Sequence, residues 1–334
     1  MTIMDVPVID VSPFYSGGPA GKRAVAEAID RACTDIGFLQ LVGHPVPQDL
    51  IRRVYDSARA FFDLPDAAKA EVVRPSPDQV RGYSAIGDEG LSYSLDEVAP
   101  GDLKESLSVG PVDVPAGDPY YHGPAAGPHF APNIWPAQVP DLAESWTEYF
   151  RQMERFSADV MRMFALGLGL EEEFFTPTID RHISMLRVLN YPDQPQPPEP
   201  GQLRAGAHSD YGSLTLLVQE QAPGGLQVRN KAGEWVPVPP VEGAFVLNIG
   251  DLMMEWTNDR WISTLHRVVN PPRDAALGSR RQSIVFFHQP NYDAMIECLP
   301  HCASPDNPPK YAPISSGDHL RNKFVKQTTF GGAG

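Results

Sequence analysis

The chain has 334 residues, of which 42% are hydrophobic and 21% are charged, so it can bury a sizeable core and does not have the composition of a disordered protein. Its formal net charge of -15 argues against a surface that binds nucleic-acid phosphates or an anionic membrane. The 35 prolines interrupt the chain too often for a helical bundle or a coiled coil, and they favour short strands joined by stiff turns.

The three cysteines, Cys33, Cys298 and Cys302, are too few for a disulfide framework and suit a reducing compartment. The first residues lack the basic flank and apolar stretch of a signal peptide. No apolar run reaches the roughly 18 residues that argue for a membrane-spanning helix. We therefore expect a cytoplasmic protein with no nucleic-acid, membrane or obligate protein partner.

The N-terminal part alternates short strands with longer helices. Residues 6–11 form a short apolar run that predicts a strand. Apolar residues recur with helical spacing over residues 19–36, and Gly37 ends that helix. Residues 38–42 predict a second strand, and residues 47–63 predict a second helix.

Residues 74–140 are rich in proline and glycine and show no sustained period. We expect long loops with short strands there, of the kind that often cover a site. The longest helical pattern follows over residues 140–166, with large apolar side chains repeating along one face. Such a stripe predicts a helix that packs against the core.

Beyond this helix the pattern changes to short segments of strand character, separated by turns rich in Gly, Pro or Asn. The predicted strands are residues 182–191, 213–219, 225–229, 234–238, 244–249, 264–270 and 282–289. Their regular spacing favours an antiparallel barrel or a double-sheet jelly roll.

These patterns together predict one fold over residues 1–334, mainly β with flanking helices. We expect a helix-rich N-terminal region at residues 1–175 and a jelly-roll catalytic core at residues 176–300. A C-terminal segment at residues 301–334 completes the chain.

The first candidate site begins with two potential metal ligands, His208 and Asp210. Residues two apart in an extended chain point to the same face, so the imidazole and the carboxylate converge. His266 opens a later strand, which can return to this pair in a barrel. Two imidazoles and one carboxylate are the facial ligand set of non-haem Fe(II) oxygenases, although hydrolytic zinc sites use similar ligands.

Arg281 and Ser283 favour the oxygenase chemistry over the zinc alternative. They share one face of a predicted strand and offer a guanidinium and a hydroxyl to a carboxylate. Tyr191 ends the strand that precedes the His208–Asp210 pair, and its hydroxyl can reach the same carboxylate. This order of residues predicts a metal site beside a carboxylate socket.

The chain resembles the iron(II)- and 2-oxoglutarate-dependent dioxygenases of the isopenicillin N synthase type over nearly its whole length. The most specific motifs are His208-Ser209-Asp210, Gly224-Gly225-Leu226-Gln227-Val228, Asn248-Ile249-Gly250-Asp251, His266-Arg267-Val268 and Arg281-Gln282-Ser283. The N-terminal segments that also look similar are Val6-Pro7-Val8-Ile9-Asp10, Asp35-Ile36-Gly37-Phe38, Phe61-Phe62-Asp63-Leu64-Pro65, Arg81-Gly82-Tyr83 and Lys104-Glu105-Ser106. The resemblance implies a double-stranded β-helix, or jelly roll, flanked by helices.

The resemblance also implies the cofactors and the reaction. Fe(II) would bind His208, Asp210 and His266. With O2, such enzymes decarboxylate the cosubstrate 2-oxoglutarate to succinate and CO2, and they oxidise, most often hydroxylate, an unactivated carbon of a small-molecule substrate.

The distal carboxylate of 2-oxoglutarate would bind Arg281 and Ser283, with Tyr191 as a looser match. The same pair also fits isopenicillin N synthase itself, an Fe(II) oxidase and cyclase that uses no 2-oxoglutarate and binds the carboxylate of its substrate there. A non-catalytic small-molecule binding protein is an alternative of another class, but a receptor has no need for a coordinatively open metal.

Substrate contacts follow from strand parity. Met185 and Arg187 share a strand face with the tyrosine of the carboxylate socket, and Phe287 shares the face of Arg281. Tyr83 can reach the substrate from a covering loop. Arg187 has two interpretations, namely contact with a substrate carboxylate or phosphate, and an internal ion pair with an Asp or Glu.

Two further features predict ordinary structure rather than sites. Gly167 and Gly169 end a helix, whereas the glycines of a nucleotide-binding motif open one, so Gly169 predicts a helix cap. Cys298, His301 and Cys302 lack the second ligand pair of a structural zinc site and predict a plain loop.

Overall fold

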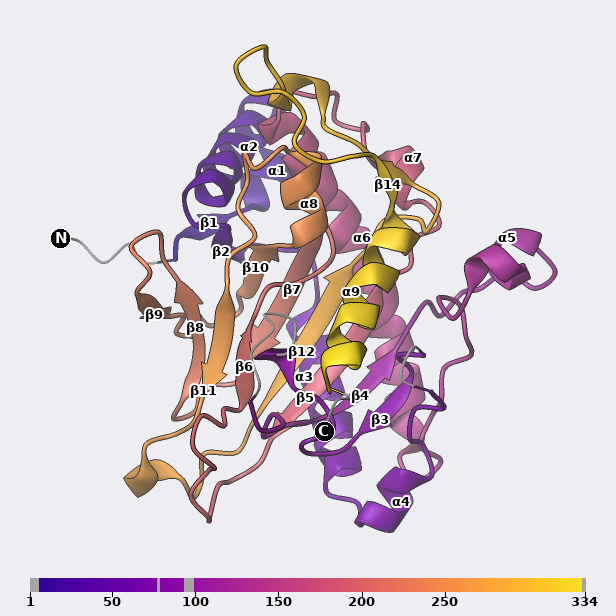
Figure 1. Ribbon diagram of the computed structural model, residues 1–334, viewed down its shortest axis with the longest axis vertical. Helices are drawn as coiled ribbons and strands as arrows, with labels where there is room; N and C mark the ends of the chain where they lie inside the picture. Colours follow the sequence, from indigo (N-terminus) through magenta and orange to yellow (C-terminus); the bar gives the residue numbers. More distant parts are fainter. Residues whose placement is uncertain (1–5, 77–78, 93–98, 332–334) are drawn as a thin grey trace.

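Two facing β-sheets and a layer of helices make up the protein. The computed structural model describes residues 6–76, 79–92 and 99–331, with side chains described up to Phe324. An eight-stranded sheet and a four-stranded sheet form the centre, and the long helices pack on the outer side of the larger sheet (Figure 1). Within those ranges no helix is long and apolar enough to cross a membrane.

The helical layer consists mainly of α2 (Gly18–Asp35), α3 (Gln48–Phe62) and α6 (Pro140–Gly167). These are the three helices that the sequence predicts. α6 begins at a proline, whose missing N–H costs nothing in the first turn, and it buries Trp146, Phe150 and Met153 along one face. Short helices are α1 (Ser12–Ser16), α4 (Asp66–Ala70), α5 (Pro119–His122) and α7 (Thr176–Ile179).

The large sheet has the strand order β1-β2-β10-β7-β12-β5-β4-β3. Its strands are β1 (Val8–Asp10), β2 (Phe38–Val42), β10 (Phe245–Ile249), β7 (Leu214–Gln219), β12 (Arg281–His288), β5 (Met185–Tyr191), β4 (Glu105–Val109) and β3 (Gly82–Ser84). Alternate residues such as Val188, Ile284 and Phe286 belong to the core shared with the helices.

The small sheet has the order β6-β11-β8-β9 and faces the other side of the large one. Its strands are β6 (Ala205–His208), β11 (His266–Val269), β8 (Gly225–Arg229) and β9 (Trp235–Pro237). A second core, which includes Phe38, Tyr191, Val228 and Val246, fills the space between the sheets. The predicted jelly roll with flanking helices is therefore confirmed.

Several elements were not predicted individually from the sequence. β6 was missed because its Ala-Gly-Ala sequence has little β propensity. β3 and β4 extend the large sheet from a segment that was expected to be mostly loop. α8 (Asp251–Trp256) is short and the sequence of α9 (Ser316–Gly331) is only weakly periodic, so neither was predicted. A small hairpin of β13 (Met295–Ile296) and β14 (Ile314–Ser315) precedes α9.

The register of β12 against β5 decides which side chains face the space between the sheets. Residues paired across antiparallel strands lie on the same face. The pairs on that face are Arg281 with Tyr191, Ser283 with Leu189, Val285 with Arg187, and Phe287 with Met185. Strand pairing therefore brings the predicted carboxylate and substrate residues onto one interior surface.

Candidate active site

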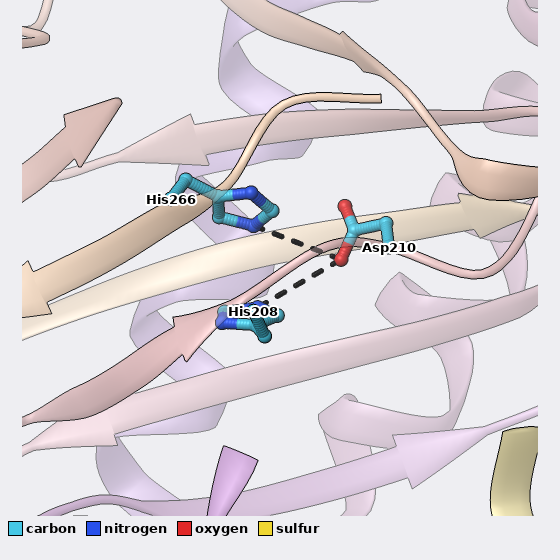
Figure 2. A group of neighbouring side chains, drawn as sticks. All are labelled: His208, Asp210 and His266. Atoms are coloured by element: carbon cyan, nitrogen blue, oxygen red, sulfur yellow. Dashed lines mark ion pairs between the residues drawn. The ribbon is translucent and has the colours of Figure 1, made fainter. Parts of the chain in front are cut away.

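The residues His208, Asp210 and His266 meet at one end of the small sheet. β6 ends at His208, β11 begins at His266, and these two residues are paired across the strands. The Nε2 atoms of His208 and His266 lie 3.8 Å and 3.7 Å from Oδ1 of Asp210 (Figure 2). Three potential ligand atoms therefore converge on one point, as the sequence predicts.

Both imidazoles are oriented by their own backbone. Nδ1 of His208 lies 2.8 Å from the carbonyl oxygen of Gly206, and Nδ1 of His266 lies 3.2 Å from that of Thr264. A carbonyl oxygen only accepts hydrogen bonds, so each Nδ1 carries the proton. Each Nε2 then keeps its lone pair free and directed at the shared point, which is the arrangement of a metal-binding histidine.

The carboxylate of Asp210 is held in the same manner. Its Oδ2 atom accepts hydrogen bonds from the Thr215 hydroxyl at 2.5 Å and from the Asn248 side-chain amide at 2.7 Å. Thr215 and Asn248 come from the paired strands β7 and β10 of the large sheet. Oδ1 therefore remains available for a metal while Oδ2 fixes the plane of the carboxylate.

The protonation states match those of metal ligands. Burial, reinforced by the nearby His266, lowers the pKa of His208 to about 3, so its imidazole is neutral near pH 7. Burial alone would raise the pKa of Asp210. The two imidazoles and the hydrogen bonds from Asn248 and Thr215 outweigh that effect, and the pKa falls below its ordinary value.

This ligand set fits an Fe(II) ion. Two neutral imidazoles and one carboxylate occupy one face of an octahedral metal and leave positions for other ligands. Among the described residues, no second group of three His, Cys, Asp or Glu side chains gathers this closely. Cys298, His301 and Cys302 accordingly form no metal cluster there, and all three cysteines are free.

Arg281 lies on the interior face of the large sheet with its guanidinium only partly satisfied. Its side chain is 2% exposed. The Nη2 atom donates to Gln219 Oε1 at 2.8 Å and to the Ser283 hydroxyl at 3.3 Å, but the buried Nε and Nη1 atoms have no hydrogen-bond partner. Burial lowers the pKa of Arg281 below its ordinary value, but an arginine stays charged.

Tyr191 lies beside this guanidinium. The Arg281 Cζ atom is 5.2 Å from the centroid of the Tyr191 ring, within the range of a cation–π contact. Tyr191 is also buried, and burial raises the pKa of its hydroxyl. The structure therefore brings Arg281, Ser283 and Tyr191 together around two unsatisfied donors that match a carboxylate.

The predicted substrate residues Met185, Arg187 and Phe287 lie on the same interior face, but Arg187 has an internal partner. Its Nη1 atom lies 3.2 Å from Glu89 Oε2, and its Nε donates to the Ser108 hydroxyl at 2.9 Å. Burial would raise the pKa of Glu89, but Arg187 and two further cations lower it to about 2. The contacts therefore support the internal ion-pair interpretation of Arg187.

Tyr83 points the other way, and its predicted substrate contact is wrong. It pairs with Leu107, which pairs with Val188 on the helix-facing side of the sheet. Its hydroxyl donates to Glu105 at 2.6 Å, and its ring packs edge-on against Phe61. Strand β3, where a loop was expected, fixes this orientation.

Sequence reasoning missed three side chains that complete the site. Thr215 and Gln219 are four residues apart on β7, so strand parity would have placed them on one face, but their contacts with Asp210 and Arg281 depend on tertiary pairing. Asn248 stands in a motif that was noticed, but its contact with Asp210 depends on the pairing of β10 with β7, which has no local signal.

Comparisons with known proteins agree with this geometry. A family model described as "non-haem dioxygenase in morphine synthesis N-terminal" matches residues 6–138. A second, described as "2OG-Fe(II) oxygenase superfamily", matches residues 183–290, which contain the three candidate ligands and the Arg281–Ser283 pair.

Individual proteins are similar over nearly the whole chain. A 2-oxoglutarate-Fe(II) type oxidoreductase, hxnY, from Emericella nidulans is 38% identical over 95% of this chain and 89% of its own length. A homoarginine-6-hydroxylase from Oryza sativa subsp. japonica is 31% identical, with 96% of each chain covered. A full-length Neurospora crassa protein, crystallised in complex with alpha-KG and thymine, is 34% identical, with 96% of both chains covered, and superposes with a TM-score of 0.82.

Proposed function

The chain belongs to the 2OG-Fe(II) oxygenase superfamily and is an Fe(II)- and 2-oxoglutarate-dependent oxygenase; from this premise we propose that it hydroxylates an unactivated carbon of a small-molecule substrate. In this reaction O2 oxidises both molecules, so that 2-oxoglutarate leaves as succinate and CO2 while the substrate gains a hydroxyl group. Related proteins named for hydroxylation of a small molecule, such as the homoarginine-6-hydroxylase, support this class of reaction.

The observation that supports binding of 2-oxoglutarate in this reaction is the pair of unsatisfied nitrogen atoms on Arg281. A buried guanidinium without a full set of acceptors is costly, because each unpaired donor loses its hydrogen bonds to water. The distal carboxylate of 2-oxoglutarate would accept from Nε or Nη1, with Ser283 as a further donor and Tyr191 beside them. By holding the distal carboxylate, these three residues would orient the other end of 2-oxoglutarate toward the metal ligands.

His208, Asp210 and His266 would hold the iron, which supplies the oxygen-activating chemistry when it is bound together with 2-oxoglutarate. The side chains around them keep these ligands in place, since Thr215 and Asn248 leave Asp210 only one free oxygen atom. The Nδ1 atom of each histidine faces a carbonyl oxygen, so the lone pair of each Nε2 is directed at the metal position.

For the substrate we propose an approach along the interior face that carries Met185, Arg187 and Phe287. These residues share their face with Arg281 and Ser283, and Phe287 pairs with Thr215, the residue that holds Asp210. Met185 and Phe287 would supply apolar contacts. Arg187 would supply a hydrogen bond from a guanidinium that Glu89 has already fixed in position.

The test is succinate release in a panel of small molecules. Protein loaded with Fe(II) in air should release succinate from 2-oxoglutarate faster when the correct substrate is added, and a product heavier by one oxygen atom should appear by mass spectrometry. Asp210→Ala, which removes a ligand, serves as the inactive control. Oxidation of a substrate without any 2-oxoglutarate would instead support the oxidase alternative, and turnover without O2 would support a hydrolase.

A further inference from the structure

Asp251, the first residue of α8, lies directly behind the metal ligands. Its backbone N–H donates to the carbonyl oxygen of Asp210 at 2.7 Å. The preceding Gly250 approaches Gly212 so closely that a Cβ atom on it would lie 2.1 Å from the Gly212 carbonyl oxygen. The start of α8 is thus packed against the backbone of the loop that carries Asp210.

The carboxylate of Asp251 contacts three separate parts of the chain. Its Oδ2 atom accepts from the Ser209 hydroxyl at 3.2 Å, and Ser209 stands between the ligands His208 and Asp210. Its Oδ1 atom accepts from the Ser263 hydroxyl at 2.6 Å, on the segment that leads into His266. One carboxylate therefore joins the two segments that carry all three ligands.

The third partner of Asp251 belongs to the C-terminal helix. Lys323 of α9 donates to Asp251 Oδ2 at 2.6 Å, and this is an ion pair in which the Asp251 side chain is 9% exposed. In Figure 1, α9 lies across the front of the sheets and close to α8. The contact therefore links a helix near the end of the chain to the segments that hold the metal ligands.

Other contacts of α9 end on α8 and on the loop that carries Asp210. Nε2 of His319 lies 3.2 Å from Glu255 Oε1 on α8. The ring of Phe324 packs edge-on against Tyr211, the residue after Asp210, with centroids 6.0 Å apart, and the Lys323 ammonium lies 5.9 Å from the Tyr211 ring centroid. When α9 is docked, it therefore contacts both α8 and the loop that carries Asp210.

We propose that Asp251 is a positioning residue that couples docking of α9 to the geometry of the metal ligands. The inference rests on the proposed metal site, but not on any particular substrate. With Lys323 in place, Asp251 holds Ser209 and Ser263 at a fixed separation, and so it holds His208, Asp210 and His266 in register. Without Lys323, the carboxylate loses its charged partner and the two ligand segments are less firmly joined.

The experiment measures metal binding directly, by anaerobic titration with Co(II) followed by its visible absorption. Asp251→Asn should raise the Co(II) dissociation constant by about 10-fold, the lower end of the range for direct partners of metal ligands, because Asp251 acts on the ligands through Ser209 and Ser263. Lys323→Met should raise it several-fold, and the double variant should bind no more weakly than Asp251→Asn alone, because both changes break one link.

The matched control is Lys310→Met, which removes a lysine that pairs with the exposed Asp259 at 2.8 Å and not with Asp251. Equal Co(II) affinity in Lys323→Met and Lys310→Met would overturn the coupling. It would also be overturned if the loss of affinity in the double variant equalled the product of the losses in Asp251→Asn and Lys323→Met. If Asp251→Asn does not fold, Ser263→Ala takes its place in the cycle.

A further readout separates positioning from general stability. The absorption band of the anaerobic Fe(II)–2-oxoglutarate complex should change in Lys323→Met at saturating Fe(II), whereas a variant that is merely less stable would keep the wild-type band. An unchanged band would overturn the proposal. Failure of the proposed function is distinguishable, since it would appear as wild-type protein that binds neither Co(II) nor Fe(II).

Discussion

The metal centre and the Arg281 end of the barrel interior are both buried, but they differ in how completely the chain satisfies them. At the metal centre, Nδ1 of each histidine contacts a carbonyl oxygen, and Oδ2 of Asp210 has two donors. At the other end, two nitrogen atoms of Arg281 have no partner. The first site is organised by the fold itself, whereas the second keeps two donor atoms that the described protein groups do not satisfy.

Arg187 sharpens this difference because it is an arginine on the same interior face. It is paired with Glu89 and Ser108, whereas the partners of Arg281 are a neutral amide and a hydroxyl. An arginine with an internal carboxylate needs no anionic ligand. The comparison therefore supports Arg281 as the proposed partner of the acidic ligand, whereas Arg187 already has an internal partner.

The largest effect should come from the ligands themselves. His266→Ala removes one of three metal-binding groups, so Co(II) affinity should fall by more than about 100-fold, the upper end for loss of a mere orienting partner. Succinate release should fall to background. Isothermal titration with Co(II) checks the first outcome. Wild-type affinity in this variant would show that His266 does not bind the metal.

The next largest effect should come from removing Arg281, the proposed partner of the 2-oxoglutarate carboxylate. Arg281→Met should weaken binding of 2-oxoglutarate by about 100-fold, because removing one member of a buried charge pair costs about 2–5 kcal/mol. Co(II) affinity should be unchanged. Arg187→Met is the matched control and should leave 2-oxoglutarate affinity nearly intact. If both variants lose 2-oxoglutarate affinity to the same extent, the two arginines are not distinguished by their partners.

A smaller effect is expected from the support of Asp210. Thr215→Val keeps the shape of the side chain but deletes the 2.5 Å hydrogen bond to Oδ2. Metal affinity should fall by about 10-fold, since Asn248 still holds the carboxylate. Thr178→Val, which loses only the hydrogen bond from its hydroxyl to the Phe175 carbonyl oxygen just before α7, should bind Co(II) like the wild type. No difference between the two variants would mean that Oδ2 needs no such support.

A separate effect concerns pH and the stability of the metal-free protein. Burial, with the nearby His182, lowers the pKa of His288 to about 3. Below about pH 6.5 the unfolded chain therefore binds a proton on this imidazole, whereas in the folded chain the imidazole stays neutral until the pH nears 3. The free energy of unfolding must then fall as pH drops from about 6.5 toward 3. At pH 5 this one histidine accounts for about 2 kcal/mol of that loss.

Denaturant titrations at pH 7 and pH 5 test this expectation. His288→Gln should show a smaller drop between the two pH values than the wild type, whatever its stability at pH 7. His122→Gln, which changes an exposed histidine, is the control and should keep the wild-type drop. An unchanged drop in His288→Gln would show that the buried imidazole is protonated in the folded state.

The sequence was sufficient for the parts of the protein that depend on local pattern. The stripe of α6 and the spacing of the C-terminal strands follow from helical and strand periodicity, and they led to the helices and the jelly roll. The facial triad was also accessible, because His208 and Asp210 obey strand parity and His266 opens a strand. The residues 301–334 were seen only as a C-terminal segment, although α9 forms there.

Only the tertiary structure decided the orientations that make these residues a site. Strand pairing turned Tyr83 toward Phe61 and set Asn248 against Asp210, and the loop after β3 supplied Glu89 as the partner of Arg187. Such contacts join residues far apart in the chain, where periodicity carries no information. A sequence determines which groups are present and which face of an element they occupy, but only packing determines which buried donors remain without a partner.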